Sequence, residues 1–117
     1  MQVFYIVSKS PACALVHEDA LAKIKASSVA GNKVTGIFFI SEGAQTASSL
    51  YETGSAAGKI RDRYFALAKD LNCLLLVCGR AFKTCGFNNS VVKEGFTLSG
   101  NTELIAKMCT SDEVVQF

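Results

Sequence analysis

The 117-residue sequence has no apolar run near the roughly 20 residues that a membrane-spanning helix needs. The apolar segment close to its first residue is only five residues long and has no basic residue before it, so a secretory signal is not predicted. We therefore expect a cytoplasmic protein. A net charge of +2 is too small a basic surplus for a nucleic-acid-binding surface, and we expect the one basic cluster, Lys59 to Arg63, to lie on a solvated helix face.

Motifs that would mark a metal, nucleotide or protease site are also missing. No two cysteines have C-x-x-C spacing, so neither a zinc ribbon nor a thioredoxin-type dithiol is supported. The segment SKSPACA, residues 8–14, lacks the glycines of a phosphate-binding loop. His17 is the only histidine, so a Cys-His protease site would depend on that residue alone, and we predict a surface or core position for it.

What the chain does contain is enough apolar material, half of its residues, for one packed domain spanning residues 1–117. Continuous apolar runs predict strands, and apolar residues at helical spacing predict helices. The predicted strands cover residues 2–7, 33–40, 73–78, a short part of 88–100, and 113–117; the predicted helices cover 14–29, 59–71, a short stretch from 79 to 85, and 101–110. Because strands alternate with helices and are apolar throughout, we predict an α/β fold, a three-layer α/β/α sandwich with a mostly parallel five-stranded sheet.

The helical spacing also predicts which side chains face the core. These are Leu15, Leu21, Ile24 and, more weakly, Val29 in the first helix, Ile60, Tyr64, Ala68 and Leu71 in the second, and Ile105 with Cys109 in the last. Residues 41–58 are small and polar without a sustained period, and we predict a long surface loop with at most one helical turn. A loop of this length in a compact domain is more often functional than incidental.

Cys78 is the residue best placed for chemistry. In open parallel sheets reactive groups gather at the carboxyl ends of the strands, and Cys78 ends a central strand. It also opens a short helix, whose N-terminal amides favour an anion. Arg80 and Lys83 add positive potential, and Gly79 removes a side chain beside the sulfur so that another protein's sulfur can approach. We predict that these three residues stabilise a reactive sulfur on Cys78; the alternative is a buried, unreactive cysteine at the end of a strand.

A second cysteine of the chain is not expected to form a disulfide with Cys78, although Cys13, which follows the first strand at the same edge of the sheet, stays open as a residue that could reach it. Cys73 lies five residues earlier, which predicts the opposite face of the sheet about 16 Å away. Cys85 follows by seven residues, about 10 Å along a continuous helix and too far for a disulfide. Cys109 is predicted to be in the core, and Cys13 lies in the loop after the first strand. Any sulfur exchange is therefore expected to involve another molecule.

Four stretches give the sequence a resemblance to the DsrE family of small sulfur-transfer proteins, and within it to members that serve tRNA 2-thiolation. They are IFFISEGA (37–44), VCGRAFKTCGF (77–87), GFTLSG (95–100) and SDEVVQF (111–117). Together with the spacing of the predicted elements they cover most of the chain. The resemblance implies a sulfurtransferase in which Cys78 takes sulfane sulfur from a donor, holds it as a persulfide and passes it to a cysteine of an acceptor protein.

The resemblance also implies partners. It predicts a hetero-oligomer with related TusB- and TusC-like or DsrF- and DsrH-like chains, a TusA-like sulfur donor and a TusE- or DsrC-like acceptor. No metal or organic cofactor is implied, and neither nucleic acid nor a membrane is contacted directly. Two alternatives stay open: a DsrE-like subunit in dissimilatory sulfur oxidation, and a non-catalytic structural subunit of such a complex.

Overall fold

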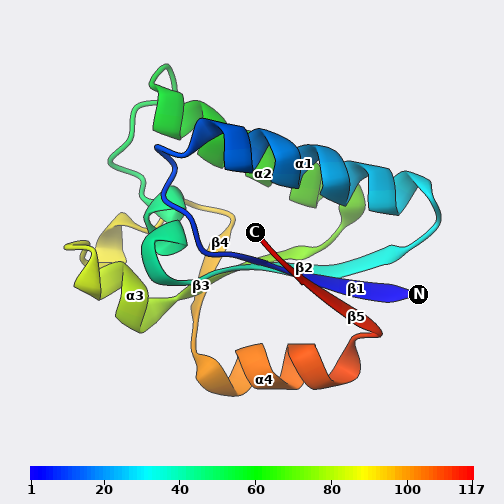
Figure 1. Cartoon of the computed structure of the whole chain (residues 1–117). Helices are drawn as coiled ribbons and strands as arrows, with labels where there is room; N and C mark the ends of the chain where they lie inside the picture. Colours follow the sequence, from blue (N-terminus) through cyan, green and yellow to red (C-terminus); the bar gives the residue numbers. More distant parts are fainter.

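The computed structural model describes residues 1–117, along which strands and helices alternate. The elements are β1 (Gln2–Val7), α1 (Ala14–Val29), β2 (Lys33–Phe39), the 3-10 helix η1 (Ser41–Ala47), α2 (Ala56–Leu71), β3 (Leu74–Cys78), α3 (Gly79–Thr84), the 3-10 helix η2 (Asn89–Val91), β4 (Phe96–Ser99), α4 (Asn101–Thr110) and β5 (Glu113–Gln116). The five strands form one sheet in the order β4-β3-β2-β1-β5, and every neighbouring pair is parallel. Helices α1 and α2 cover one face and α4 the other (Figure 1), which confirms the predicted three-layer fold. None of these helices has both the length and the apolar character that crossing a bilayer requires.

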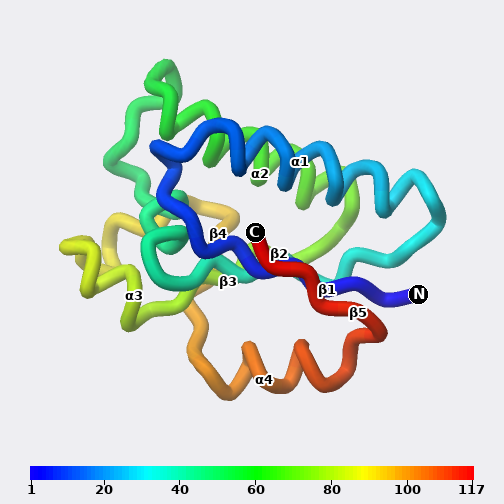
Figure 2. Tube along the Cα trace, viewed as in Figure 1, coloured from blue at the N-terminus to red at the C-terminus, as the bar shows by residue number.

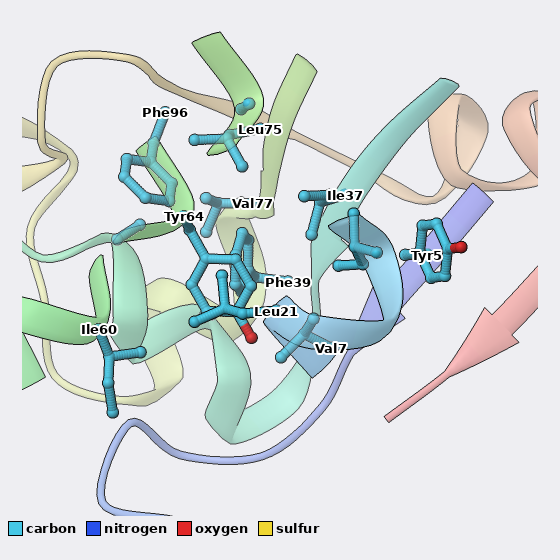
Figure 3. Packing of buried hydrophobic residues seen from close by; sticks show 14 of the residues in the cluster. Tyr5, Val7, Leu21, Ile37, Phe39, Ile60, Tyr64, Leu75, Val77 and Phe96 are labelled. Carbon is cyan, nitrogen blue, oxygen red and sulfur yellow. The ribbon is translucent and has the colours of Figure 1, made fainter. Parts of the chain in front are cut away.

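The face of the sheet beneath α1 and α2 carries the larger core. Side chains of alternate strand residues, such as Tyr5, Ile37 and Phe39, point toward the two helices and are buried. The Phe39 ring packs edge-on against Tyr64 of α2 with 5.0 Å between ring centroids (Figure 3). Burying a side chain of this size stabilises the fold by roughly 1.5–3 kcal/mol. This core fixes β2 and β3 side by side and so fixes where their carboxyl ends lie.

The opposite face is covered more thinly. Its cluster of Phe4, Ile6, Phe38 and Leu76 is buried, but α4 contains no fully buried residue and contributes mainly the half-buried Leu104. The predictions that Ile105 and Cys109 face the core were wrong, because both are exposed. Cys109 follows Leu104 by five residues, which turns it about 140° around the helix axis and away from the sheet.

Helix α1 has the predicted bounds but a different buried side. Leu21 and Ile24 are buried as predicted, whereas Leu15 is 86% and Val29 80% exposed, so those two predictions were wrong. The buried residues are His17, Ala20, Leu21 and Ile24, at the i, i+3, i+4, i+7 spacing of one helical face. The burial of His17 therefore determines which side of α1 packs against the core.

His17 is buried because both ring nitrogens have partners. Its Nε2 lies 2.8 Å from the carbonyl oxygen of Ser10 and 3.1 Å from that of Lys9, and carbonyls only accept. The proton is therefore on Nε2, and Nδ1 accepts a hydrogen bond from the Tyr64 hydroxyl at 2.8 Å. Burial raises the pKa of Tyr64 far above its usual value, which keeps that hydroxyl protonated as a donor. The pair fastens the loop after β1 to both helices and has no catalytic arrangement around it.

Helix α2 begins at Ala56, three residues before the predicted start, because the Ser55 hydroxyl caps it by accepting from the Gly58 amide at 3.1 Å. The predicted core residues Ile60, Tyr64 and Ala68 are buried.

The predicted solvated face of α2 was wrong at one position, because Arg61 is only 1% exposed. Its guanidinium donates to the carbonyl oxygens of Ser48 at 2.9 Å and Tyr51 at 2.6 Å, and to the Asp62 carboxylate at 2.9 Å. Arg63, two residues later, is exposed as predicted. Arg61 is thus an internal anchor for the segment that leads into the helix.

The segment 41–58 was predicted to be a surface loop, and this is wrong for its first half. Most of η1 is buried against the carboxyl end of the sheet, which its small residues allow. A methyl group built on Gly43 would lie 2.3 Å from the carbonyl oxygen of Val7, so only glycine lets the two backbones approach this closely.

Replacing Gly43 by alanine is therefore expected to lower the free energy of unfolding by roughly 1–3 kcal/mol, since η1 must move away from β1. Denaturant unfolding measures the change. Gly54→Ala is the matched control, because nothing lies within 4 Å of a methyl group at that position. Equal stability of the two variants would contradict the close approach of η1 to the sheet.

Candidate functional site

A hollow of about 560 Å³ lies at the carboxyl ends of β2 and β3. We call it the rim hollow. Its walls come from the residues after β2, from the end of β3, from α3 and from the first turn of α4; they are Ile40, Ser41, Glu42, Cys78, Arg80, Ala81, Thr84, Cys85, Asn101 and Leu104. The segments that follow β2 and β3 thus meet at one edge of the sheet. The loop after β1 does not line the hollow, because β2 separates β1 from β3, and Cys13 in that loop is exposed elsewhere.

Cys78 lies at the floor of the rim hollow. It is the last residue of β3, and α3 begins at the next residue, so the chain turns from strand to helix at this cysteine. Its side chain is half-buried and packs against the buried cluster on the α4 side of the sheet, which includes Phe38 and Leu76. No hydrogen bond reaches its sulfur, and its immediate surroundings are this apolar cluster and the hollow that it lines.

The three residues predicted to assist Cys78 are divided between two hollows. Arg80 is exposed and lines the rim hollow with Cys78. Lys83 does not line the rim hollow; it lines an adjoining hollow of about 470 Å³ with Gly79, Arg80 and Ser99, and a further one of about 480 Å³ beside Gly86. A methyl group on Gly79 would have a single neighbour, the carbonyl oxygen of Ser99 at 3.6 Å, so the space beside the cysteine is open. This arrangement brings Arg80 to the sulfur's hollow and leaves Lys83 outside it.

Cys73 is separated from Cys78 by the sheet. It packs against the core beneath α1 and α2, whereas Cys78 packs against the cluster on the other face, which confirms the prediction from strand alternation. Burial raises the pKa of the Cys73 thiol from 9.0 to about 11. Since the thiolate is the reactive form, Cys73 is chemically quiet at neutral pH.

The sequence reasoning missed that Cys85 shares the rim hollow with Cys78. Seven residues are about two helical turns, so the two side chains lie on one side of α3. That spacing is the signal in the sequence that places Cys85 on the same side of the helix as Cys78. Asn101 and Leu104 also line the hollow and were not predicted. No local pattern identifies them, because they lie there only since α4 begins directly after β4 at this edge of the sheet.

The Cys85 sulfur is held by two contacts from η1. The side-chain amide of Gln45 donates to it with 3.7 Å between nitrogen and sulfur, and the thiol donates to the carbonyl oxygen of Ser41 at 3.8 Å. Ser41 has a left-handed backbone, with φ of 50°, an uncommon conformation for a residue other than glycine. The pKa of Tyr51 is raised, mainly by burial and also by the nearby Cys85 sulfur. These two contacts therefore fix the position of the Cys85 sulfur, whereas no hydrogen bond fixes that of Cys78.

Comparison with known proteins gives a family and a fold. The model of a family described as the DsrE/DsrF-like family matches residues 1–117. The crystal structure of the ychN protein from E. coli is similar over 100% of both chains, with a TM-score of 0.74 and 17% sequence identity, a likeness of fold alone. No curated protein sequence matches the chain.

Proposed function

Since the chain belongs to the DsrE/DsrF-like family, whose role is in sulfur relay, we propose that it is a sulfurtransferase that carries sulfane sulfur on Cys78. One observation carries the proposal: Cys78 ends a central strand with its sulfur half-buried in a hollow that a second sulfur can enter. Cys73, by contrast, packs against the core beneath α1 and α2, where burial raises the pKa of its thiol.

The proposed reaction has two exchange steps. In the first, the Cys78 thiolate attacks the outer sulfur of a donor persulfide, the donor's S–S bond breaks, and the donor leaves as a thiolate. Cys78 then carries the persulfide. In the second, an acceptor thiolate attacks that outer sulfur, and Cys78 leaves as a thiolate. The sulfane sulfur keeps its oxidation state, so no metal, organic cofactor or oxidant is required.

The neighbours of Cys78 have unequal parts in this proposal. Gly79 leaves the side of the sulfur open to a donor or acceptor cysteine. Arg80 places a positive charge on the wall of the rim hollow, where it favours a thiolate or persulfide anion. Lys83 does not line the rim hollow and contributes less, because solvent screens its charge from the sulfur.

We place the protein in the relay for tRNA 2-thiouridine synthesis, as a TusD-like subunit, on the GFTLSG and SDEVVQF stretches. The donor would be TusA-like and the acceptor TusE- or DsrC-like, all in the cytoplasm. Family members typically form hetero-oligomers. Leu74, Ile105 and Met108 are exposed apolar residues on the α4 side of the sheet. They suit contact with a neighbouring subunit, either TusB- or TusC-like or DsrF- or DsrH-like. A DsrE-like role in sulfur oxidation uses the same chemistry and differs in the acceptor that the protein captures.

The test is the intact mass of the reduced chain after incubation with a small-molecule persulfide donor. We expect a gain of about 32 Da, one sulfur, in the wild type. Cys78→Ser should gain none, while the matched control Cys73→Ser should gain as much as the wild type. If the wild type gains no mass, or Cys78→Ser gains it equally, Cys78 is not the carrier and a non-catalytic subunit becomes the better explanation.

A further inference from the structure

We propose that Cys85 is a second sulfur carrier in the rim hollow, and that it receives the outer sulfur of the Cys78 persulfide before that sulfur leaves the protein. The proposal rests on the proposed function of Cys78. It makes the hollow a two-thiol site with an entry position at its floor and an exit position at the end of α3.

The placement of the two sulfurs supports this order. Phe39 pairs with Val77 in the sheet, so the next residues along the two strands, Ile40 and Cys78, are neighbours. Ser41 follows Ile40, and its carbonyl oxygen lies 3.8 Å from the Cys85 sulfur. Cys85 is thus held on the wall of the hollow directly beside the strand that flanks Cys78.

The separation excludes one reaction between the cysteines and permits another. They are the cap residues at the two ends of α3, about 10 Å apart along the helix axis, whereas a disulfide needs Cα atoms within about 7 Å. A direct disulfide would therefore require α3 to unwind. A persulfide extends Cys78 into the hollow by one S–S bond of about 2 Å, and helical side chains lean toward the helix N-terminus, which turns the Cys85 sulfur toward Cys78.

The remaining gap is closed by rotation of the two side chains and a shift of the end of α3. This helix has six residues, and only Phe82 is fully buried. Its last turn is exposed at Lys83 and Thr84, and Phe87 after it stacks on the buried Phe82, so the shift that the transfer needs is confined to residues 83–86.

The transfer is balanced within the two residues. The Cys85 thiolate, having given its proton to solvent, attacks the outer sulfur of the Cys78 persulfide. The S–S bond on Cys78 breaks, a new S–S bond forms on Cys85, and Cys78 leaves as a thiolate that can be loaded again. Nothing is oxidised or reduced, and no further reactant is needed.

Gln45 is the positioning residue for this step. Its amide donates to the Cys85 sulfur, and the Ser41 carbonyl accepts from the thiol, so the two contacts fix where this sulfur lies in the hollow. No hydrogen bond reaches Cys78. Cys85 is therefore the sulfur with a defined position from which to attack the persulfide on Cys78.

Trypsin separates the two cysteines, because Arg80 and Lys83 lie between them. Cys78 falls in the peptide 70–80 and Cys85 in the peptide 84–93; a Cys73→Ser background leaves one cysteine in the first. The reduced chain is mixed with less than one equivalent of a small-molecule persulfide donor, trapped with an alkylating agent at successive times and digested. We expect persulfide first on 70–80 and then, as that signal falls, on 84–93.

Three variants test the order of transfer. Cys85→Ser should keep all the sulfur on Cys78. Cys78→Ser, with Cys78→Ala as a second replacement if the serine variant fails to fold, should reduce the sulfur on 84–93 at least tenfold. Gln45→Met keeps the size of the side chain and removes the donor; it should slow the movement of sulfur to 84–93 without changing the rate at which Cys78 is loaded.

The outcomes separate this proposal from the function on which it rests. Persulfide confined to 70–80 in the chain with both cysteines would overturn the relay and leave Cys78 as the carrier. Equal labelling of 84–93 with and without Cys78 would show that Cys85 is loaded directly, which also overturns it. Absence of persulfide from both peptides would reject the sulfurtransferase itself.

Discussion

Replacing Arg61 by methionine is expected to lower the free energy of unfolding by roughly 2–4 kcal/mol. The guanidinium is buried and donates to the backbone carbonyls of Ser48 and Tyr51. Methionine fills similar space but leaves those acceptors without a donor, and each unsatisfied buried group costs about 1–3 kcal/mol. Replacement of a whole buried ion pair by apolar residues can be neutral, but here the acceptors are main-chain atoms that the substitution does not remove.

Arg63→Met is the matched control for Arg61→Met. It removes the same side chain two residues away, where the partner is the exposed Glu18, and surface ion pairs contribute at most about 1 kcal/mol. The hydrogen bond from Arg63 lowers the pKa of the Glu18 carboxyl, so acid weakens this pair while leaving the bonds of Arg61 to the carbonyls unchanged. Urea unfolding of the two variants decides between them: equal losses would mean that the buried hydrogen bonds of Arg61 add nothing.

Cys73 is expected to be alkylated about a hundredfold more slowly in the folded protein than in the unfolded chain at pH 7.5. Burial raises the pKa of its thiol from 9.0 to about 11, and the thiolate fraction falls tenfold for each pH unit of that rise. The rate in the folded protein should keep climbing with pH to about 11, whereas the rate in the unfolded chain should level off near pH 9.

A Cys78→Ser variant isolates this reaction, because Cys73 is then the only cysteine in the tryptic peptide 70–80. The extent of alkylation of that peptide gives the rate with and without denaturant. Equal rates in the two conditions would show that the thiol is not shielded, and the contrast drawn here between Cys73 and Cys78 would fail.

The fold could be predicted because its signal is local to each strand. Strands of a parallel sheet are buried on both faces, so VFYIV and LLLVC are apolar throughout and can be recognised in the sequence. Burial of polar residues could not be predicted in this way. His17 and Arg61 are inside because of acceptors and donors supplied by other segments, and the hydroxyl partner of His17 is on Tyr64, 47 positions away.

The same distinction applies to the site. Cys78 and the meeting of two strand ends follow from topology, and the carboxyl edge of a parallel sheet can be located from strand order alone. The holding of Cys85 by Gln45 and Ser41 depends on η1 lying against α3, and the small residues of η1 carry no periodic signal. Contacts between segments so far apart in the sequence can be identified only in the three-dimensional structure.

The pairing of β5 with β1 has a consequence for the order of folding. The last residues of the sequence lie along its first strand (Figure 2), and the Gln2 amide donates to Asp112 across 110 positions of chain. Closing so long a loop is entropically expensive, so this pairing is expected to form late, after the nearer pairs β1–β2 and β2–β3. Until then one edge of β1 presents unpaired amides and carbonyls that another chain could join. Once paired, the four residues of β5 cover this edge of β1 and replace it with a shorter edge than the six residues of β1 would present.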